Sequence, residues 1–283
     1  MNAKWPLRNF EAQFQIMKNL LNLSREISTR RAPGFKVTFQ FISSIATVGH
    51  RPIWSGEPIV PEERMTIESV LPTGYGDAKY ICELMIDETL HKHPDRFRAM
   101  VVRPGQIAGS STSGYWNPME HLSFLIKSSQ TLKALPDFDG LLSWTPVDEV
   151  AGTLVDLVFL PEDKTHYPIY HVDNPVRQPW KEMIPVLADA LDISPDGVIP
   201  FEDWVQRVRD HPRQVEGPEG ENPAFLLIDF LDDNFIRMSC GGLLLDTIKV
   251  REHSKTLANA GPVNEKVTKQ FIQSWKDMGF LSQ

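Results

Sequence analysis

Cysteines, long apolar runs and targeting signals are scarce or missing in this sequence. The 283 residues include two cysteines, Cys82 and Cys240, which form neither a disulfide framework nor a metal-ligand pattern. No apolar run approaches the roughly 20 residues that cross a membrane, and the amino-terminal stretch has no apolar core followed by a small-residue cleavage site. We therefore expect a cytoplasmic protein with reduced cysteines, no metal and no membrane contact.

Positive charge is in the minority. Lys and Arg number 29 against 37 Asp and Glu, which gives a formal net charge of −8 and a pI near 5.5. Nucleic-acid-binding domains usually present a clustered basic face, so we expect no nucleic-acid partner. The hydrophobic share of 41% and the charged share of 23% are typical of a globular protein with a substantial core.

Glycines are present, but not as a dinucleotide-binding turn. Such a turn places closely spaced glycines between a strand and a helix, whose amino end then binds the pyrophosphate. The glycine pairs here lack that context; they are Gly105/Gly109, Gly217/Gly220 and Gly241/Gly242. The sequence therefore predicts no cofactor-binding residues, and we expect no cofactor to bind the chain as given.

A tyrosine and a lysine stand four residues apart in the stretch P-T-G-Y-G-D-A-K, as Tyr75 and Lys79. The apolar residues that follow predict a helix to about residue 93, so the two side chains share one helix face. A lysine ammonium beside a phenol, whose pKa is ordinarily about 10, favours the phenolate and makes the tyrosine a usable acid at neutral pH. The same spacing also fits a half-buried tyrosine beside a solvated lysine.

Strand-like runs lie on both sides of this helix. Residues 37–42 end in Ser43 and Ser44, and residues 99–102 end in Arg103. Strand, helix and strand form a parallel crossover unit, whose strands deliver functional groups to one crevice at their carboxyl ends. A serine pair at a strand end also fits simple turn chemistry.

These segments together resemble the extended branch of the short-chain dehydrogenase/reductase superfamily, and most closely the terminal thioester-reductase domain of fungal nonribosomal-peptide and polyketide synthetases. The resemblance implies that Tyr75 donates a proton to a substrate carbonyl, that Lys79 is its pKa partner and a ribose ligand, and that Ser44 orients the carbonyl oxygen. The matching stretches follow the family's order and are Asn2–Pro6, Phe41–Ile45, Tyr75–Lys79, Arg103–Ile107, Trp144–Ala151 and Tyr170–Pro175.

The family's first strand, its G-x-x-G-x-x-G turn and the following helix have no counterpart here. We therefore expect the cofactor-binding half to be absent, with NADPH binding only if a missing segment or a partner completes the site. Four further residues are predicted to line the substrate pocket: Ser43, Gln106, Trp116 and Met119. Aromatic and methionine residues at helical spacing also fit a plain core.

Several other polar features have local explanations. The serine-rich run 109–114 is interpreted as a substrate-side loop, with a phosphate cradle as the alternative. Asp148 and Glu149 are interpreted as helix caps, and His91 as a solvated residue at a helix end. The proline-rich stretch 49–73 is predicted to be a loop over the crevice, without regular helix apart from a short one within 62–71.

The predicted fold is α/β, with a truncated Rossmann-like parallel sheet and flanking helices in residues 1–175 and a mostly helical substrate lid in residues 176–283. Residues 212–223 are predicted to form a mobile linker. The truncated sheet would leave residues 37–42 at an edge, which we expect the helix 10–30 or a second copy of the chain to cover, the latter as a homodimer.

Three functions fit these residues. The first hypothesis is a reductase-like enzyme of polyketide or nonribosomal-peptide biosynthesis in which Ser44, Tyr75 and Lys79 act on a carbonyl or thioester-derived intermediate by acid–base chemistry. It would promote cyclisation or isomerisation without hydride transfer. The alternatives are an NADPH-dependent thioester or carbonyl reductase completed by another segment, and a non-catalytic carrier-binding remnant. The partner expected is a small-molecule or carrier-bound substrate.

Overall fold

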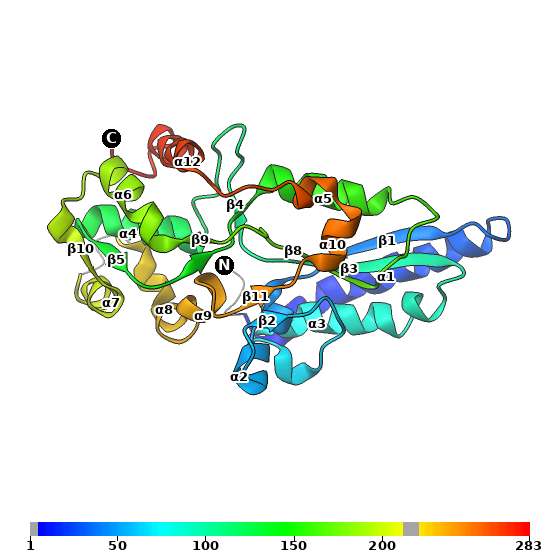
Figure 1. Ribbon diagram of the computed structural model, residues 1–283. Helices are drawn as coiled ribbons and strands as arrows, with labels where there is room; N and C mark the ends of the chain where they lie inside the picture. The colour runs from blue at the N-terminus through cyan, green and yellow to red at the C-terminus, as the bar shows by residue number, and fades with distance from the viewer. Residues whose placement is uncertain (1–4, 212–220) are drawn as a thin grey trace. The chain divides into compact units, whose positions relative to one another are not determined.

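The chain divides into two compact units, and each unit is built from three separate stretches of the sequence. The computed structural model describes residues 5–211 and 221–283, which are traced in Figure 1. The first unit comprises residues 1–105, 149–175 and 243–260, and the second comprises 106–148, 176–242 and 261–283. The chain passes from one unit to the other at several points, and the boundary expected at residue 175 is one of them. Most of the expected linker 212–223, and residues 2–4 of the first matching stretch, lie outside the described residues.

The first unit is built on a three-stranded parallel sheet in the order β1-β3-β8. β1 (Val37–Ile42) runs beside β3 (Phe97–Pro104) from the pair Val37 and Phe97 to the pair Ile42 and Val102. β8 (Ile169–Val172) pairs with the other side of β3. β3 is buried along almost its whole length, as expected of a central strand in a parallel sheet. The predicted α/β fold with a Rossmann-like parallel sheet is confirmed.

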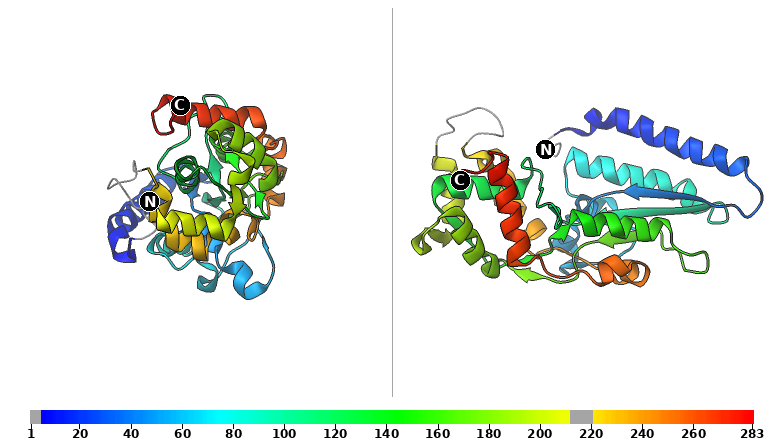
Figure 2. Two further views of the ribbon diagram at one scale, coloured as in Figure 1. Left: turned by 90° about the vertical axis from the view of Figure 1, so that its left-hand side faces the viewer. Right: turned by 90° about the horizontal axis from the view of Figure 1, so that it is seen from above.

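Helices cover both faces of this sheet. α1 (Glu11–Thr29) and α3 (Gly74–Asp87) lie on one face, and α5 (Val147–Val158) lies on the other (Figure 2). Gln40 of β1 donates a hydrogen bond to the Leu154 carbonyl of α5 at 3.1 Å. The core on the α1 and α3 side is apolar and contains Met17, Leu21, Cys82, Ile86, Leu90, Phe97, Ala99, Val101 and Ile169.

Among the described residues, β1 pairs only with β3, so its other edge carries no strand. α1 packs against the sheet face through Met17 and Leu21, and Ile42 at the end of β1 remains 37% exposed. Cover of this edge by a second copy of the chain stays a prediction.

The proline-rich stretch 49–73 is more regular than the sequence predicted. It contains α2 (Arg51–Ser55) and a two-residue strand, β2 (Ile59–Val60), besides the short 3-10 helix η4 (Ile67–Ser69). Pro52 lies in the first turn of α2, where proline fits because its missing N–H has no helical partner. β2 pairs with β11 (Leu244–Leu245), which is followed by the short helices α10 (Ile248–His253) and α11 (Lys255–Ala258). The prediction that residues 49–61 contain no regular helix was therefore wrong, because α2 lies within them.

The second unit is mostly helical around an aromatic core. Short strands pair as β4 (Ile107–Ala108) with β7 (Thr145–Pro146), β5 (Leu135–Asp137) with β10 (Val198–Pro200), and β6 (Leu141–Leu142) with β9 (Gln178–Pro179). Its α-helices are α4 (His121–Leu132), α6 (Trp180–Leu191), α7 (Phe201–Asp210), α8 (Ile228–Asp233), α9 (Phe235–Ser239) and α12 (Glu265–Asp277). Within the described ranges, no helix is both long and apolar enough to span a membrane.

Candidate functional site

Tyr75 and Lys79 lie one turn apart near the start of α3. Thr73 caps this helix, because its hydroxyl accepts a hydrogen bond from the Gly76 N–H at 3.0 Å. The Lys79 ammonium lies 5.8 Å from the centre of the Tyr75 ring. The shared helix face expected from the sequence is therefore present, although α3 ends at Asp87 and a separate 3-10 turn, Leu90–Lys92, follows it.

Lys79 is held at the carboxyl end of β1. Its ammonium donates to the Ile42 carbonyl at 2.7 Å and lies 5.0 Å from the centre of the Phe41 ring. Burial lowers the pKa of Lys79, while the nearby Cys82 thiol and Glu83 carboxylate act to raise it, and the net shift is downward. The structure thus fixes an ammonium group between a tyrosine and a strand end.

Ser44 follows β1 directly and begins the 3-10 helix η3 (Ile45–Val48). Its hydroxyl accepts a hydrogen bond from the Ala46 N–H at 3.1 Å, and the residue is partly exposed. Tyr75 is also partly exposed, and its hydroxyl has no hydrogen-bond partner within the described part of the chain. The structure therefore brings Tyr75 and Lys79 of α3 to the end of β1, which Ser44 follows. Ser44 and Tyr75 are both partly exposed, so the hydroxyl of each can form a hydrogen bond with a bound molecule.

Ser43 has a different environment from Ser44. It is 3% exposed, and its hydroxyl donates to the Glu83 carboxylate of α3. Glu83 also accepts two hydrogen bonds from Arg103 of β3, at 3.0 and 2.6 Å. The Ser43 hydroxyl, which was predicted to face a substrate, is thus buried and hydrogen-bonded to Glu83. Sequence reasoning missed the role of Glu83, although its position four residues after Lys79 places it on the same side of the helix.

The other three predicted pocket residues belong to the second unit. Gln106 donates to the Ile107 carbonyl at 2.9 Å, and Met119 is 41% exposed. Trp116 is 3% exposed and stacks on Trp275 with ring centres 5.4 Å apart. Trp116 therefore lies in the aromatic core, as the alternative interpretation had it, while the pocket role of Gln106 and Met119 stays a prediction.

The serine-rich loop 109–114 closes on itself and on α5. The Ser110 hydroxyl accepts hydrogen bonds from the N–H groups of Thr112 and Ser113, at 3.2 and 3.0 Å. Asp148 accepts from the Ser111 N–H at 2.6 Å and from the Ser110 hydroxyl at 3.1 Å. Asp148 therefore anchors the loop rather than acting only as a helix cap. A phosphate cradle is disfavoured, because these N–H groups are already bonded and a carboxylate lies beside them.

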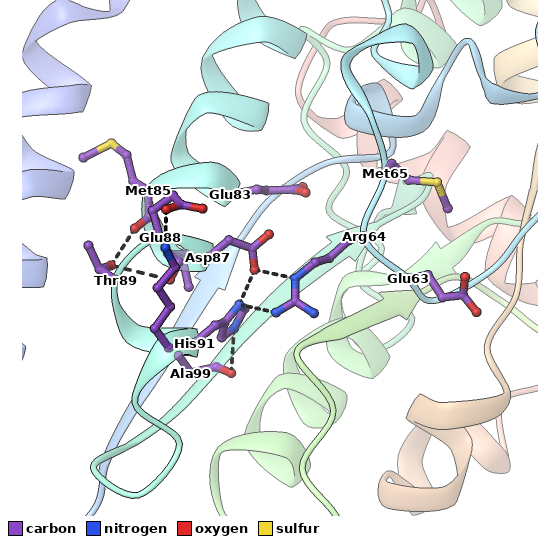
Figure 3. A network of polar contacts seen from close by, with 12 residues as sticks. Glu63, Arg64, Met65, Glu83, Met85, Asp87, Glu88, Thr89, His91 and Ala99 are labelled. Atoms are coloured by element: carbon purple, nitrogen blue, oxygen red, sulfur yellow. Dashed lines mark hydrogen bonds and ion pairs between the residues drawn. The ribbon is translucent and has the colours of Figure 1, made fainter.

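The interpretation of His91 as a solvated helix-end residue was wrong. Its ring is buried, with Nδ1 2.5 Å from the Asp87 carboxylate and Nε2 3.0 Å from the Ala99 carbonyl (Figure 3). Arg64 donates to the same carboxylate at 2.8 Å. This network joins α3 to β3 and to the stretch before η4. No group of three or more His, Cys, Asp or Glu residues that could hold a metal occurs in the described ranges.

Glu62 ties the stretch after β2 to the rest of the first unit. The residue is 2% exposed, and its carboxylate accepts hydrogen bonds from the N–H groups of His171, Lys249 and Val250, at 3.0, 2.5 and 3.2 Å. Burial raises the pKa of Glu62, the three N–H groups oppose the rise, and the result is about 7. Residues 59–62 are therefore anchored to β8, β11 and α10.

This raised pKa predicts a pH-dependent stability. Because the folded pKa lies above the unfolded value of 4.5, the contribution of Glu62 is fully present below pH 4.5 and is lost as the pH rises through about 7. The loss amounts to about 3 kcal/mol of unfolding free energy. Glu62→Gln should remove this dependence, measured by urea unfolding at pH 4.5 and 8. An unchanged difference in unfolding free energy between the two pH values would contradict the assignment.

Comparison with known proteins assigns the chain to a family. A profile of the NAD-binding family described as Male sterility protein (NAD_binding_4) matches residues 11–154. The chain is 77% identical over 282 residues to the non-reducing polyketide synthase dbaI of Emericella nidulans, and 58% identical over 284 residues to the 3-methylorcinaldehyde synthase of a Phoma species. These matches cover 100% and 99% of this chain but 11% of each relative.

Solved structures agree on the fold. The terminal R domain from the myxalamid PKS-NRPS biosynthetic pathway matches with a TM-score of 0.68 at 22% identity, over 87% of this chain and 59% of that one. A thiolation-reductase di-domain from an archaeal nonribosomal peptide synthetase also matches with a TM-score of 0.68, at 15% identity, over 93% and 52%. The chain belongs to the NAD-binding Male sterility family of extended short-chain dehydrogenase/reductase domains. The two relatives named above are a non-reducing polyketide synthase and a 3-methylorcinaldehyde synthase, and this chain spans about a tenth of the length of each.

Proposed function

We propose that this chain activates the carbonyl group of a carrier-bound polyketide thioester for reductive release as an aldehyde. The observation that carries the proposal is the Lys79 ammonium, fixed between the Tyr75 ring and the Ile42 carbonyl beside Ser44. A phenol held beside an ammonium can give its proton to a carbonyl oxygen as that oxygen becomes negative, and the Ser44 hydroxyl can orient the same oxygen. With a hydride added to the thioester carbon, which NADPH would supply, this protonation gives a hemithioacetal. Its hydroxyl then loses the proton as the C–S bond breaks, so that the carrier leaves as the thiol and the aldehyde remains.

The relatives favour reduction over the cyclisation hypothesis. The name of the 3-methylorcinaldehyde synthase describes an aldehyde product, which lies two electrons below a thioester in oxidation state. The di-domain structure pairs a reductase with a thiolation domain, and such a domain carries its substrate as a thioester. The aldehyde product and the thioester carrier both fit an NADPH-dependent thioester reductase, which is one of the alternatives predicted from the sequence.

The residues present fit one end of a nicotinamide dinucleotide. When bound, NADPH would supply the hydride to the thioester carbon. Lys79 would bind the nicotinamide ribose, and Tyr75 lies one turn away with a hydroxyl that makes no hydrogen bond to any described residue. The pyrophosphate end needs backbone amides at a glycine-rich turn, and none of the glycine pairs in the sequence provides one. Reduction therefore requires this end of the site to be completed by residues outside the 283.

We accordingly expect the 283-residue chain alone to bind NADPH no more tightly than the millimolar range. Without pyrophosphate contacts, ribose contacts to Lys79 supply little of the orientation that the cofactor needs. Titration calorimetry of the purified chain with NADPH measures this directly, and NADH serves as a second ligand. Saturable binding in the micromolar range would show that another part of the chain holds the pyrophosphate.

The missing glycine turn also keeps cofactor-free cyclisation or isomerisation as a second candidate. An acid beside a carbonyl can promote enol formation without hydride transfer. The two candidates differ in their need for NADPH. Grafting this chain in place of the 77% identical segment of the Emericella nidulans synthase provides a complete system for the test. Aldehyde release that requires NADPH supports reduction, whereas equal turnover without NADPH to a product of unchanged oxidation state supports the second candidate.

A further inference from the structure

Three side chains that the proposed chemistry does not touch are buried together next to Lys79. Ser43, Glu83 and Arg103 are 3%, 3% and 0% exposed. The Arg103 guanidinium binds both oxygens of the Glu83 carboxylate, and the Ser43 hydroxyl donates to the same carboxylate. The guanidinium also donates to the Glu63 carbonyl at 2.9 Å. One ion pair thus joins α3, β3, the end of β1 and the stretch before η4.

Stability alone is a weak reason for such a pair. Removing two charges from water costs several kcal/mol each, and well-packed apolar residues of similar size often stabilise a fold equally well or better. A buried pair that joins four segments of the chain can instead fix their relative placement, because a bidentate arginine–carboxylate contact tolerates little movement. The position of this pair indicates what it fixes.

The network of Ser43, Glu83 and Arg103 includes neighbours of both residues in the contact between Lys79 and Ile42. Glu83 lies one turn after Lys79 on α3, and Lys79 lies one turn after Tyr75. Ser43 directly follows Ile42, whose carbonyl accepts the Lys79 hydrogen bond, and directly precedes Ser44. A shift of α3 along β1 would break the Ser43 bond and the Lys79 bond together.

We propose that Ser43, Glu83 and Arg103 are positioning residues that lock α3 onto the end of β1, so that Tyr75, Lys79 and Ser44 meet one carbonyl oxygen. This inference rests on the proposed function for its effect on turnover. Its structural part, the placement of the Lys79 ammonium, can be measured without a substrate.

Glu83 also acts on Lys79 through its charge. The groups that face the ammonium are Tyr75, Cys82 and Glu83 from α3, and the Phe41 ring and the Ile42 carbonyl from β1. Burial lowers the pKa of Lys79, and Glu83 opposes that fall. Removal of the Glu83 charge should therefore let Lys79 lose its proton at lower pH, an effect that a purely structural role would not produce.

The test uses two variants and one control. Ser43→Ala breaks the link to β1 only, and Glu83→Leu/Arg103→Met removes the ion pair without leaving one charge alone. Ser129→Ala is the control, because Ser129 is fully buried in the second unit and its hydroxyl has no hydrogen-bond partner among the described residues. Turnover of an N-acetylcysteamine thioester with NADPH is measured in the grafted synthase, and the Lys79 titration is measured by NMR on the 283-residue chain.

We expect kcat to fall about tenfold in Ser43→Ala and about a hundredfold in the paired variant, with KM changed less than about twofold, since small misplacements of reacting groups cost such factors. The Lys79 titration should move to lower pH in the paired variant and stay unchanged in Ser129→Ala. Wild-type kcat in Ser43→Ala, or an unmoved Lys79 titration in a folded paired variant, would overturn the inference. An inactive wild-type graft would instead refute the proposed function. The positioning role is then decided by the NMR contact between the Lys79 side chain and the Phe41 ring, which should weaken in Ser43→Ala and in the paired variant; an unchanged contact in both would overturn it. If the paired variant does not fold, Ser43→Ala decides alone, because it removes only one buried oxygen.

Discussion

Turnover by the Tyr75→Phe variant is expected to be lower than wild type by about two to four orders of magnitude, the usual contribution of a general acid. Only one oxygen is removed, and it has no hydrogen-bond partner among the described residues, so the fold should be unaffected. Steady-state release of aldehyde by the grafted synthase measures the effect, with circular dichroism as the check on folding.

Tyr115→Phe is the matched control for this substitution. Tyr115 is 55% exposed and lies in the second unit, so the same atom is removed at a site without a proposed role. Lys79→Met should act through the same proton as Tyr75→Phe, and the double variant should therefore lose less than the product of the two single losses. Wild-type turnover in Tyr75→Phe would show that the catalytic group lies elsewhere.

The second large effect concerns stability. Arg103→Met should lower the unfolding free energy by about 3–5 kcal/mol, because it leaves the buried Glu83 carboxylate without its charged partner. Glu83→Leu/Arg103→Met should regain most of this loss, since both charges are removed together. Urea unfolding followed by tryptophan fluorescence measures all three proteins.

An exposed ion pair supplies the contrast. Arg30, which follows the last residue of α1, pairs with Glu26, and their side chains are 74% and 53% exposed. Such surface pairs contribute about 0–1 kcal/mol. Arg30→Met should therefore change the unfolding free energy by less than about 1 kcal/mol. Equal losses in Arg103→Met and Arg30→Met would show that burial of the Arg103 pair has no special consequence.

Local patterns predicted the framework of the first unit. The apolar run 37–42, the helix that begins at Tyr75 and the run that ends at Arg103 became β1, α3 and β3, because each pattern is short and the parallel crossover unit permits few arrangements. The same reasoning placed Ser44 at a strand end and Lys79 on the face of Tyr75. The resemblance to terminal reductase domains added the family, which the comparisons confirmed.

Contacts between distant segments could not be predicted in this way. β2 pairs with β11, which lies more than 180 residues later in the chain, and Glu62 accepts the N–H of Val250. No short-range signal marks such partners. The predictions for His91 and Asp148 relied on helix-end electrostatics, but the structure uses both side chains to join separate segments. In each case, contacts with a distant segment determine the position of the side chain, and helix-end electrostatics does not.

The central claim is that Tyr75 and Lys79 activate a thioester carbonyl for reduction. The most direct test supplies the grafted synthase with NADPH deuterated at C4 of the nicotinamide and analyses the released product by mass spectrometry. Reductive release predicts an aldehyde that carries one deuterium on its carbonyl carbon, formed at a rate that falls in Tyr75→Phe. An unlabelled product, released equally fast without NADPH and equally fast by Tyr75→Phe, would contradict it.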